Sequence, residues 1–273
     1  MIRLIAIDMD GTLLSKEHTV SEINQKAIAL AKEKGIKVVL CSGRTIENLL
    51  RFTKELNLHG EEDYVVGYNG AGAVKSASGD FIYENCLTGK ETKAITKICD
   101  ELGANYTVHT FRRAFTPRDN VHSRRETDLN GVELFIENPE GLSDEEVVTK
   151  VLVLDDPEIL DGYAPRLYEA LGEEFHVVQT MPIYLEIMRK HVNKYVGIMA
   201  VAKELGIQRE EILAIGDAMN DYEIIKEAGI GVAMGNAEDK VKEAADFVTK
   251  DHEEHGVAYA LNHFLQLGMN DFK

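Results

Sequence analysis

Two short acidic segments contain the residues of this chain that are best suited to do chemistry. One reads D-M-D-G-T-L-L at residues 8–14, and the other reads G-D-A-M-N-D at residues 216–221. Each follows a short apolar run, at residues 4–7 and 212–215. If these runs are neighbouring strands, four carboxylates converge, and like charges that close cannot all ionise without a raised pKa or a cation. We expect a divalent cation there, and Mg²⁺ suits oxygen ligands and phosphate-bearing substrates.

A third segment, S-G-R at residues 42–44, follows the apolar run at residues 37–41. Its hydroxyl and backbone N–H groups lead into an expected helix N-terminus, which is a natural anion site. Lys194, in the first turn of another expected helix, could bring a positive charge to the same place. Carboxylates, a metal ion, a hydroxyl and an ammonium group are together the parts of a phosphoryl-transfer site.

The elements that would position these segments alternate between apolar strands and amphipathic helices. Continuous apolar runs are typical of parallel strands buried on both faces. Ligands of such sheets bind beyond the carboxyl ends of the strands, where the acidic segments lie. The pattern predicts strands at residues 4–7, 37–41, 64–66, 212–215 and 231–234 and helices at residues 21–35, 46–56, 194–205 and 222–228.

The middle of the chain follows a different pattern. From about residue 83 to residue 189, strands of mixed polarity are predicted at 131–136, 176–179 and 184–188, with helices near 91–102 and 157–171. Mixed polarity is typical of half-exposed antiparallel strands. We therefore expect an α/β protein with a Rossmann-like parallel-sheet core, residues 1–82 and 190–273, and an inserted α+β domain at residues 83–189.

Charge and composition exclude several classes of protein. The 273 residues include 30 Lys and Arg against 47 Asp and Glu, a net charge of −17, which disfavours nucleic-acid and anionic-membrane partners. No apolar run approaches the ~20 residues of a membrane span, and Met1 is not followed by a cleavable leader. The odd number of cysteines fits neither a disulfide framework nor a zinc site. We expect a cytoplasmic monomer or homodimer that acts on small molecules.

These motifs, in this order, resemble those of the haloacid dehalogenase (HAD) superfamily. The whole chain is similar to its Cof-like phosphatases, which carry a large type IIB cap between the second and third motifs. The loop Y-N-G-A at residues 68–71 also resembles this branch. The segments T-M-P-I-Y-L-E-I at 180–187 and V-N-K at 192–194 resemble bacterial sugar-phosphate phosphatases. The resemblance implies Mg²⁺-dependent hydrolysis of a phosphorylated metabolite through an aspartyl-phosphate, with the cap selecting the substrate.

The resemblance also implies roles for individual residues. The catalytic residues would be the nucleophile Asp8, the general acid/base Asp10 and the charge-stabilising Lys194. The phosphate and substrate ligands would be Ser42, Gly43, Arg44, Asn69 and Asn220. The metal would be held by Asp8, the backbone oxygen of Asp10 and Asp217, with Asp221 in support. Tyr195 stands where the family usually has glycine after the lysine, which affects the shape expected of the pocket.

Other functions compete with this one. A phosphotransferase or phosphomutase would use the same aspartyl-phosphate, and the substrate could instead be flavin mononucleotide or pyridoxal phosphate. A phospho-acceptor receiver module is disfavoured by the order of the motifs and by the long insertion. A non-catalytic binding protein is disfavoured because no motif residue is missing.

Three further features have alternative interpretations. A stretch of fourteen residues inside the expected cap contains five arginines, namely Arg112, Arg113, Arg118, Arg124 and Arg125. They form either a solvated loop or contacts to the anionic or hydroxyl-rich part of a substrate. H-E-E-H at residues 252–255 lacks the spacing of a zinc motif and is expected to be solvated. Cys41 is expected to be a buried small hydrophobe.

Overall fold

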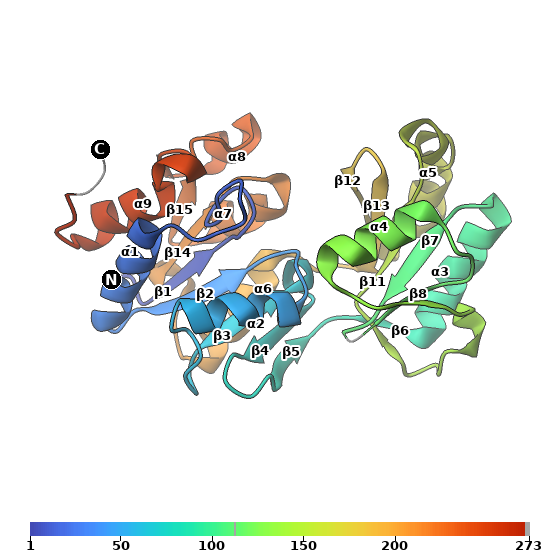
Figure 1. The fold of residues 1–273 in the computed structure, drawn as a ribbon, viewed down its shortest axis with the longest axis horizontal. Coiled ribbons are helices and arrows are strands. Elements are labelled where there is room, and N and C mark those ends of the chain that lie inside the picture. Colours follow the sequence, from blue (N-terminus) through green and yellow to red (C-terminus); the bar gives the residue numbers. More distant parts are fainter. Residues whose placement is uncertain (112, 271–273) are drawn as a thin grey trace. The chain divides into compact units, whose positions relative to one another are not determined.

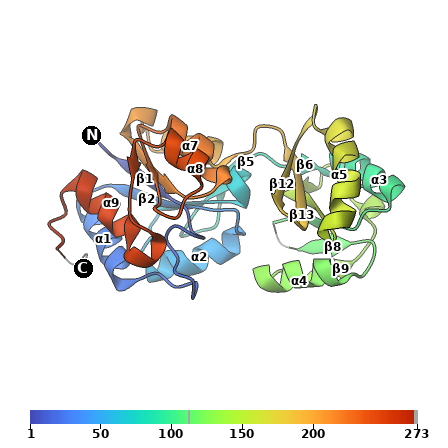
Figure 2. The same ribbon diagram turned by 90° about the horizontal axis from the view of Figure 1, so that it is seen from above.

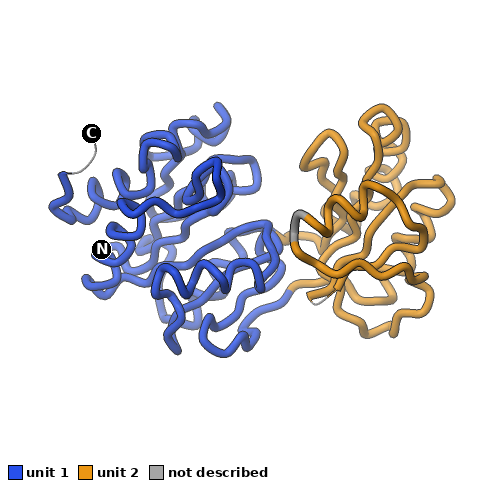
Figure 3. Tube along the Cα trace, viewed as in Figure 1, with its two compact units in different colours: residues 1–84, 193–273 blue, residues 85–192 orange. Residues whose placement is uncertain are grey.

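The structure is a computed structural model that describes residues 1–111 and 113–270. The chain forms two compact units, which Figure 3 shows in different colours. Unit 1 comprises residues 1–84 and 193–273, and unit 2 comprises residues 85–192. The sequence analysis expected the boundaries two and three residues earlier, at 82/83 and 189/190. Among the described residues, no helix is long and apolar enough to cross a membrane.

Unit 1 is built on a mixed sheet in which β1 lies between β14 and β2. The strands are β1 Leu4–Ile7, β2 Lys37–Cys41, β3 Tyr64–Gly67, β4 Gly72–Lys75, β5 Phe81–Glu84, β14 Ile212–Gly216, β15 Ile230–Ala233 and β16 Phe247–Val248. Their order is β16-β15-β14-β1-β2-β3-β4-β5, and all pairs are parallel up to β3. The expected α/β fold is confirmed, whereas the antiparallel hairpin β4–β5 was not predicted.

Helices cover both faces of this sheet. They are α1 Glu22–Glu33, α2 Ile46–Glu55, α6 Lys194–Glu204, α7 Tyr222–Glu227, α8 Asp239–Ala244 and α9 Gly256–Leu265. Figure 2 shows α1, α2 and α9 on one side of β1 and β2, with α7 on the other. The side chains on both faces of β1 are buried, which explains why its sequence is apolar without interruption. Helices α8 and α9 were not predicted.

Unit 2 has a six-stranded sheet of order β12-β13-β11-β7-β8-β9 and a small two-stranded one, β10-β6 (Figure 1). The strands are β6 Leu87–Thr88, β7 Tyr106–His109, β8 Ala114–Thr116, β9 Leu134–Ile136, β10 Val147–Val148, β11 Lys150–Leu154, β12 Phe175–Met181 and β13 Tyr184–Arg189. The helices are α3 Gly89–Leu102, α4 Val121–Asn130 and α5 Pro157–Leu171. Side chains from α3, α5 and one face of the large sheet form a single apolar core.

Helix α4 corrects the sequence prediction for this region. We expected a strand from residue 131, but the strand begins at Leu134 and a helix precedes it. Asn120 caps the helix by accepting the N–H of Ser123, and Gly131 ends it with a left-handed φ of 64°. The helix has no apolar stripe, so the sequence lacks the period of 3.6 residues by which helices are recognised.

Candidate active site

The acidic segments and the S-G-R segment meet at the carboxyl-end edge of the unit 1 sheet. Ile7, the last residue of β1, is paired with Ile215 of β14 and with Leu40 of β2. Asp8, Asp217 and Ser42 follow these three strands. The expectation that the two acidic segments follow neighbouring strands is therefore confirmed.

A tight turn after β1 shapes the first acidic segment. The carbonyl of Met9 accepts the backbone N–H groups of residues 12, 13 and 14 at 2.9–3.3 Å. Gly11 has a φ of +77°, and a Cβ there would lie 2.4 Å from Asp217 Oδ2. Only glycine meets both demands without strain. Thr12 donates from Oγ1 to Asp217 Oδ1 at 2.7 Å, which joins the two acidic segments.

Three carboxylates converge on one buried point. One oxygen from each of Asp8, Asp217 and Asp221 lies within 4.8 Å of the others. Lys194 Nζ donates to Asp8 Oδ1 and to Asp221 Oδ1, both at 2.6 Å. When all three carboxylates are ionised, one ammonium group cannot balance them and two negative charges are in excess. The residues therefore fit a divalent cation with oxygen ligands, as Mg²⁺ is.

The pKa values of these groups show the same imbalance. Burial, followed by the charge of Asp221, raises the pKa of Asp8 well above its usual range, although Lys194 acts in the opposite direction. Burial also raises the pKa of Asp217, to about 6, against the hydrogen bond from Thr12. For Lys194, burial disfavours the charged form, but Asp221 and Asp8 outweigh it and raise its pKa. Lys194 thus stays protonated, but its single positive charge is not enough to stabilise the ionised forms of the neighbouring carboxylates.

Asp221 is held in place by backbone groups. Its Oδ2 accepts the N–H groups of Asp217 and Ala218 at 3.1 and 3.2 Å. A Cβ on Gly216 would lie 2.4 Å from Asp221 Cγ, so the glycine leaves room for this carboxylate. With one oxygen bound to backbone and the other to Lys194, Asp221 is suited to orient the lysine and the Asp217 loop.

The residues expected to bind phosphate lie on adjacent loops. The Ser42 hydroxyl accepts the N–H of Arg44 at 3.2 Å, and the Ser42 carbonyl accepts the N–H of Asn69 at 3.0 Å. Asn69 adopts a left-handed φ of 55°, and its Oδ1 accepts Nδ2 of Asn220 at 3.0 Å. A Cβ on Gly43 would lie 3.0 Å from the same Asn69 oxygen. The loops after β2, β3 and β14 are therefore connected by polar side chains.

Asp10 does not join the other carboxylates, which corrects the expectation that four converge. Its side chain is 49% exposed and forms a two-point pair with Arg44, Nε to Oδ2 at 2.7 Å and Nη2 to Oδ1 at 2.5 Å. Arg44, expected to be a substrate ligand, is thus occupied by Asp10. The hydrogen bonds that Arg44 donates to Asp10 are the largest of the effects that raise the pKa of Arg44. Motif spacing cannot show which way the Asp10 side chain turns after Met9.

Sequence reasoning missed Asn236 and His252, which are connected to the loop after β1. Asn236 Nδ2 donates to the carbonyl of Gly11 at 2.8 Å, and Asn236 Oδ1 accepts the N–H of His252 at 3.1 Å. The H-E-E-H segment is solvated only in part. Glu253 and Glu254 are exposed as expected, whereas the His252 side chain is only 13% exposed and His255 Nδ1 lies 3.0 Å from Ser21 Oγ. More than 200 residues separate these partners from the loop, so no local signal could reveal them. Cys41 is buried, and burial raises the pKa of its thiol.

Among the described arginines of residues 113–125, three have separate partners. Arg113 pairs with Glu137 at 2.8 Å, Arg124 pairs with Asp119 at 2.6 Å, and Arg118 donates to the carbonyl of Ala104 at 2.9 Å. Arg124 and Arg125 lie on α4 and not in a loop. Arg112 lies outside the described residues.

Known proteins match this chain over nearly its full length. The model of the haloacid dehalogenase-like hydrolase family matches residues 5–261. YxeH of Bacillus subtilis, provisionally named a phosphatase, is 34% identical over 96% of this chain and 98% of its own. A haloacid dehalogenase-like hydrolase from Bacteroides thetaiotaomicron has a TM-score of 0.86 at 28% identity, over 97% of this chain and 100% of its own. The HAD subclass IIB sugar phosphatase BT4131 has a TM-score of 0.79 at 25% identity, over 96% of this chain and 98% of its own.

The matched range includes both acidic segments, the S-G-R loop and Lys194, together with the whole of unit 2. The resemblance that the motifs indicated is thereby confirmed for the chain as a whole. This protein belongs to the haloacid dehalogenase-like hydrolase family, and within it to the Cof-like enzymes of the phosphatase type.

Proposed function

We propose that this protein hydrolyses small phosphorylated metabolites, sugar phosphates foremost, through an aspartyl-phosphate formed on Asp8. The observation that carries the proposal is the buried contact of Lys194 Nζ with Asp8 and Asp221, beside Asp217. Although burial raises the pKa of Asp8, the ammonium group of Lys194 and a bound cation would both favour its charged, nucleophilic form, and the ammonium group would stabilise negative charge on a transferring phosphoryl group.

In this mechanism an oxygen of Asp8 attacks phosphorus in line with the ester oxygen that leaves. Asp10 protonates the departing alkoxide and then removes a proton from the water that hydrolyses the aspartyl-phosphate. Both carboxylate oxygens of Asp10 are bound by Arg44, so Asp10 must leave that pair before it can contact the leaving oxygen or the water. Ser42, Asn220 and the N–H groups near Gly43 would bind the phosphoryl oxygens.

We also propose Mg²⁺ as the cofactor. Asp8, Asp217 and the backbone oxygen of Asp10 would hold it, and Asp221 would support Asp217 through the backbone. When bound, the ion would supply positive charge for the phosphoryl oxygens. The two excess negative charges of the carboxylate cluster support this assignment.

Unit 2 is proposed to select the substrate, as the cap expected from the sequence. One face of its sheet carries a polar array in which Lys150 Nζ donates to Glu186 Oε1 at 3.0 Å. Glu186 Oε2 is buried and has no hydrogen-bond partner in the part of the chain that the structure describes. Tyr184 lies two residues earlier on the same side of β13. Such mixed donors and acceptors suit a hydroxyl-rich molecule, and the likeness to a sugar phosphatase points to the same class.

A phosphate-release screen tests the proposal. Sugar phosphates, nucleotides, flavin mononucleotide and pyridoxal phosphate would be compared with and without Mg²⁺, using the Asp8→Asn variant as the control. We expect Mg²⁺-dependent release of free phosphate, fastest with a sugar phosphate, and none from the variant. Phosphate transfer only to an added acceptor would instead show a phosphotransferase or phosphomutase. Undiminished turnover by Asp8→Asn would exclude the aspartyl-phosphate.

Two further expectations complete the proposal. Small phosphorylated metabolites and the buried, reduced thiols of Cys41 and Cys99 are compatible with a cytoplasmic enzyme. A monomer or homodimer remains the prediction, which sedimentation of the purified protein would test.

A further inference from the structure

A pocket lies at the edge of the unit 1 sheet opposite the carboxylate cluster. Its volume is about 470 Å³. It lies where β1, β2 and β3 begin, because Arg3 precedes β1, Lys37 starts β2 and Tyr64 starts β3. Lys75 ends β4, which runs antiparallel to β3, and Glu204 ends α6. A pocket of this size admits a small metabolite.

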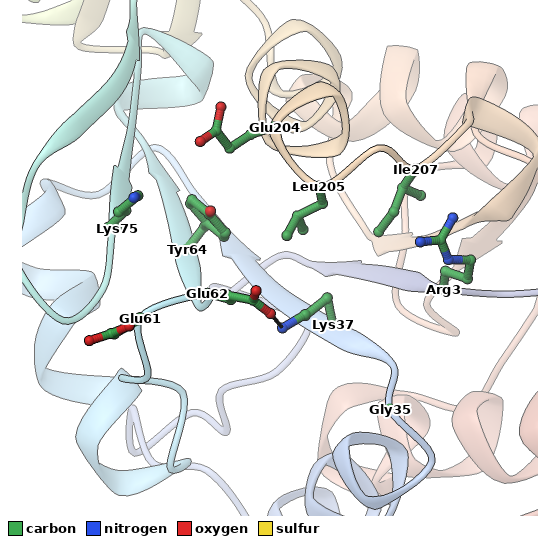
Figure 4. A pocket seen from close by; sticks show the side chains of 10 residues that line it. All are labelled: Arg3, Gly35, Lys37, Glu61, Glu62, Tyr64, Lys75, Glu204, Leu205 and Ile207. Atoms are coloured by element: carbon green, nitrogen blue, oxygen red, sulfur yellow. Dashed lines mark hydrogen bonds and ion pairs between the residues drawn. The ribbon is translucent and has the colours of Figure 1, made fainter.

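Some charged groups of the pocket are already paired. Lys37 Nζ lies 2.7 Å from Glu62 Oε2, the dashed contact in Figure 4. Arg3 Nη1 donates to Glu211 Oε2 at 3.2 Å and to the carbonyl of Gly206 at 3.1 Å. These pairs form part of the wall and need no ligand.

Other polar groups of the pocket have no such partner. Within the described residues, no hydrogen bond or ion pair is made by the side chains of Lys75, Glu204 or Tyr64. Figure 4 shows these three at one end of the pocket. The ammonium group of Lys75 is thus available for an anion and the carboxylate of Glu204 for a cation. Glu204 also ends α6, where the helix dipole adds partial negative charge that favours a cation.

Apolar side chains line the part of the pocket that lies away from Lys75. Leu205 and Ile207 line it, and Figure 4 shows Ile207 and Arg3 at the end opposite Lys75. Glu61 also lines the pocket and adds a second carboxylate to it. A ligand that meets Lys75, Glu204 and the apolar side chains carries a carboxylate and an ammonium group at one end and an apolar group at the other. An α-amino acid with an aliphatic side chain has this arrangement.

We propose that this pocket is a second ligand site, and that it binds α-amino acids with aliphatic side chains. The amino acid carboxylate pairs with Lys75, its ammonium group pairs with Glu204, and its side chain packs on Leu205 and Ile207. The site is separate from the carboxylate cluster, and the proposal does not depend on the proposed phosphatase activity.

The first test measures binding to the full-length protein by calorimetric titration. L-Leucine, L-isoleucine, L-valine and L-methionine are the probes, with Mg²⁺ and inorganic phosphate present to occupy the carboxylate cluster. We expect at least one to bind with a Kd of about 1 mM or tighter. For leucine, 3-methylbutan-1-amine lacks the carboxylate and 4-methylpentanoate lacks the ammonium group, and each should bind at least ~10-fold more weakly. Absence of binding by all four amino acids at about 10 mM would overturn the proposal.

Variants then locate the site. Lys75→Met and Glu204→Gln should each weaken binding of the tightest amino acid at least ~10-fold. Lys240→Met and Glu243→Gln change exposed residues of α8 in the same way and should leave binding unchanged. Amide shifts in the NMR spectrum of the wild-type protein should concentrate at residues 3, 37, 64, 75 and 204. Equal binding by the pocket variants, or shifts concentrated at residues 8 and 217, would contradict the assignment.

Discussion

The buried lysine provides the sharpest prediction for the carboxylate cluster. Lys194 is 1% exposed and contacts both Asp8 and Asp221 at 2.6 Å. Replacing it with methionine keeps the length and apolar stem of the side chain but leaves the buried carboxylates of Asp8 and Asp221 without the ammonium group. Removing one partner from a buried ion pair costs about 3–5 kcal/mol. For a domain of this size that is a decrease in Tm of roughly 6–20 °C in the metal-free protein.

The assay for Lys194→Met is thermal unfolding with and without Mg²⁺. Because the variant has a larger excess of negative charge, we expect Mg²⁺ to raise its Tm more than that of the wild type. The effect should appear at neutral pH, since a lysine whose pKa is raised in the folded state stabilises the protein at every pH below its usual value. Lys203→Met, on the exposed side of the same helix, is the matched control. A metal-free Lys194→Met protein as stable as Lys203→Met would refute the electrostatic account of the site.

Further predictions concern the loops around the cluster. The raised pKa of Asp217 means that its carboxyl binds a proton more tightly when folded, so metal-free stability should decrease by up to about 3 kcal/mol as pH rises from about 4 through about 6. Urea unfolding should show no such decrease in Asp217→Asn. Arg44→Met should free the Asp10 carboxylate and raise kcat, because Asp10 no longer has to leave the pair, and an unchanged or lower kcat would show that the pair does not restrain Asp10. Gly11→Ala should lower Tm and Mg²⁺ affinity together, because its Cβ would lie 2.4 Å from Asp217 Oδ2. Asn236→Ala should lower kcat/KM at least ~10-fold with a small change in Tm, whereas unchanged kinetics would exclude a positioning role.

The parts of this protein that were predictable depend on residues close together in the chain. The strands at residues 4–7 and 37–41 were predictable because burial on both faces requires unbroken apolar runs. The motif D-x-D-G-T was recognisable because its turn needs glycine at residue 11 and a hydroxyl at residue 12. Helix α4 was not predictable, because a helix without an apolar stripe leaves no periodic signal.

The sequence by itself determined the fold class, the family and the residues that carry the chemistry, since all three rest on local patterns in a characteristic order. Only the tertiary structure decided which of these side chains meet. It separated Asp10 from the other carboxylates and paired it with Arg44, and it brought Asn236 to the carbonyl of Gly11. It also formed the pocket around Lys75 and Glu204 from segments far apart in the chain. The physical reason is that side-chain direction and charge pairing depend on strand order and on loop packing, and a one-dimensional spacing contains neither.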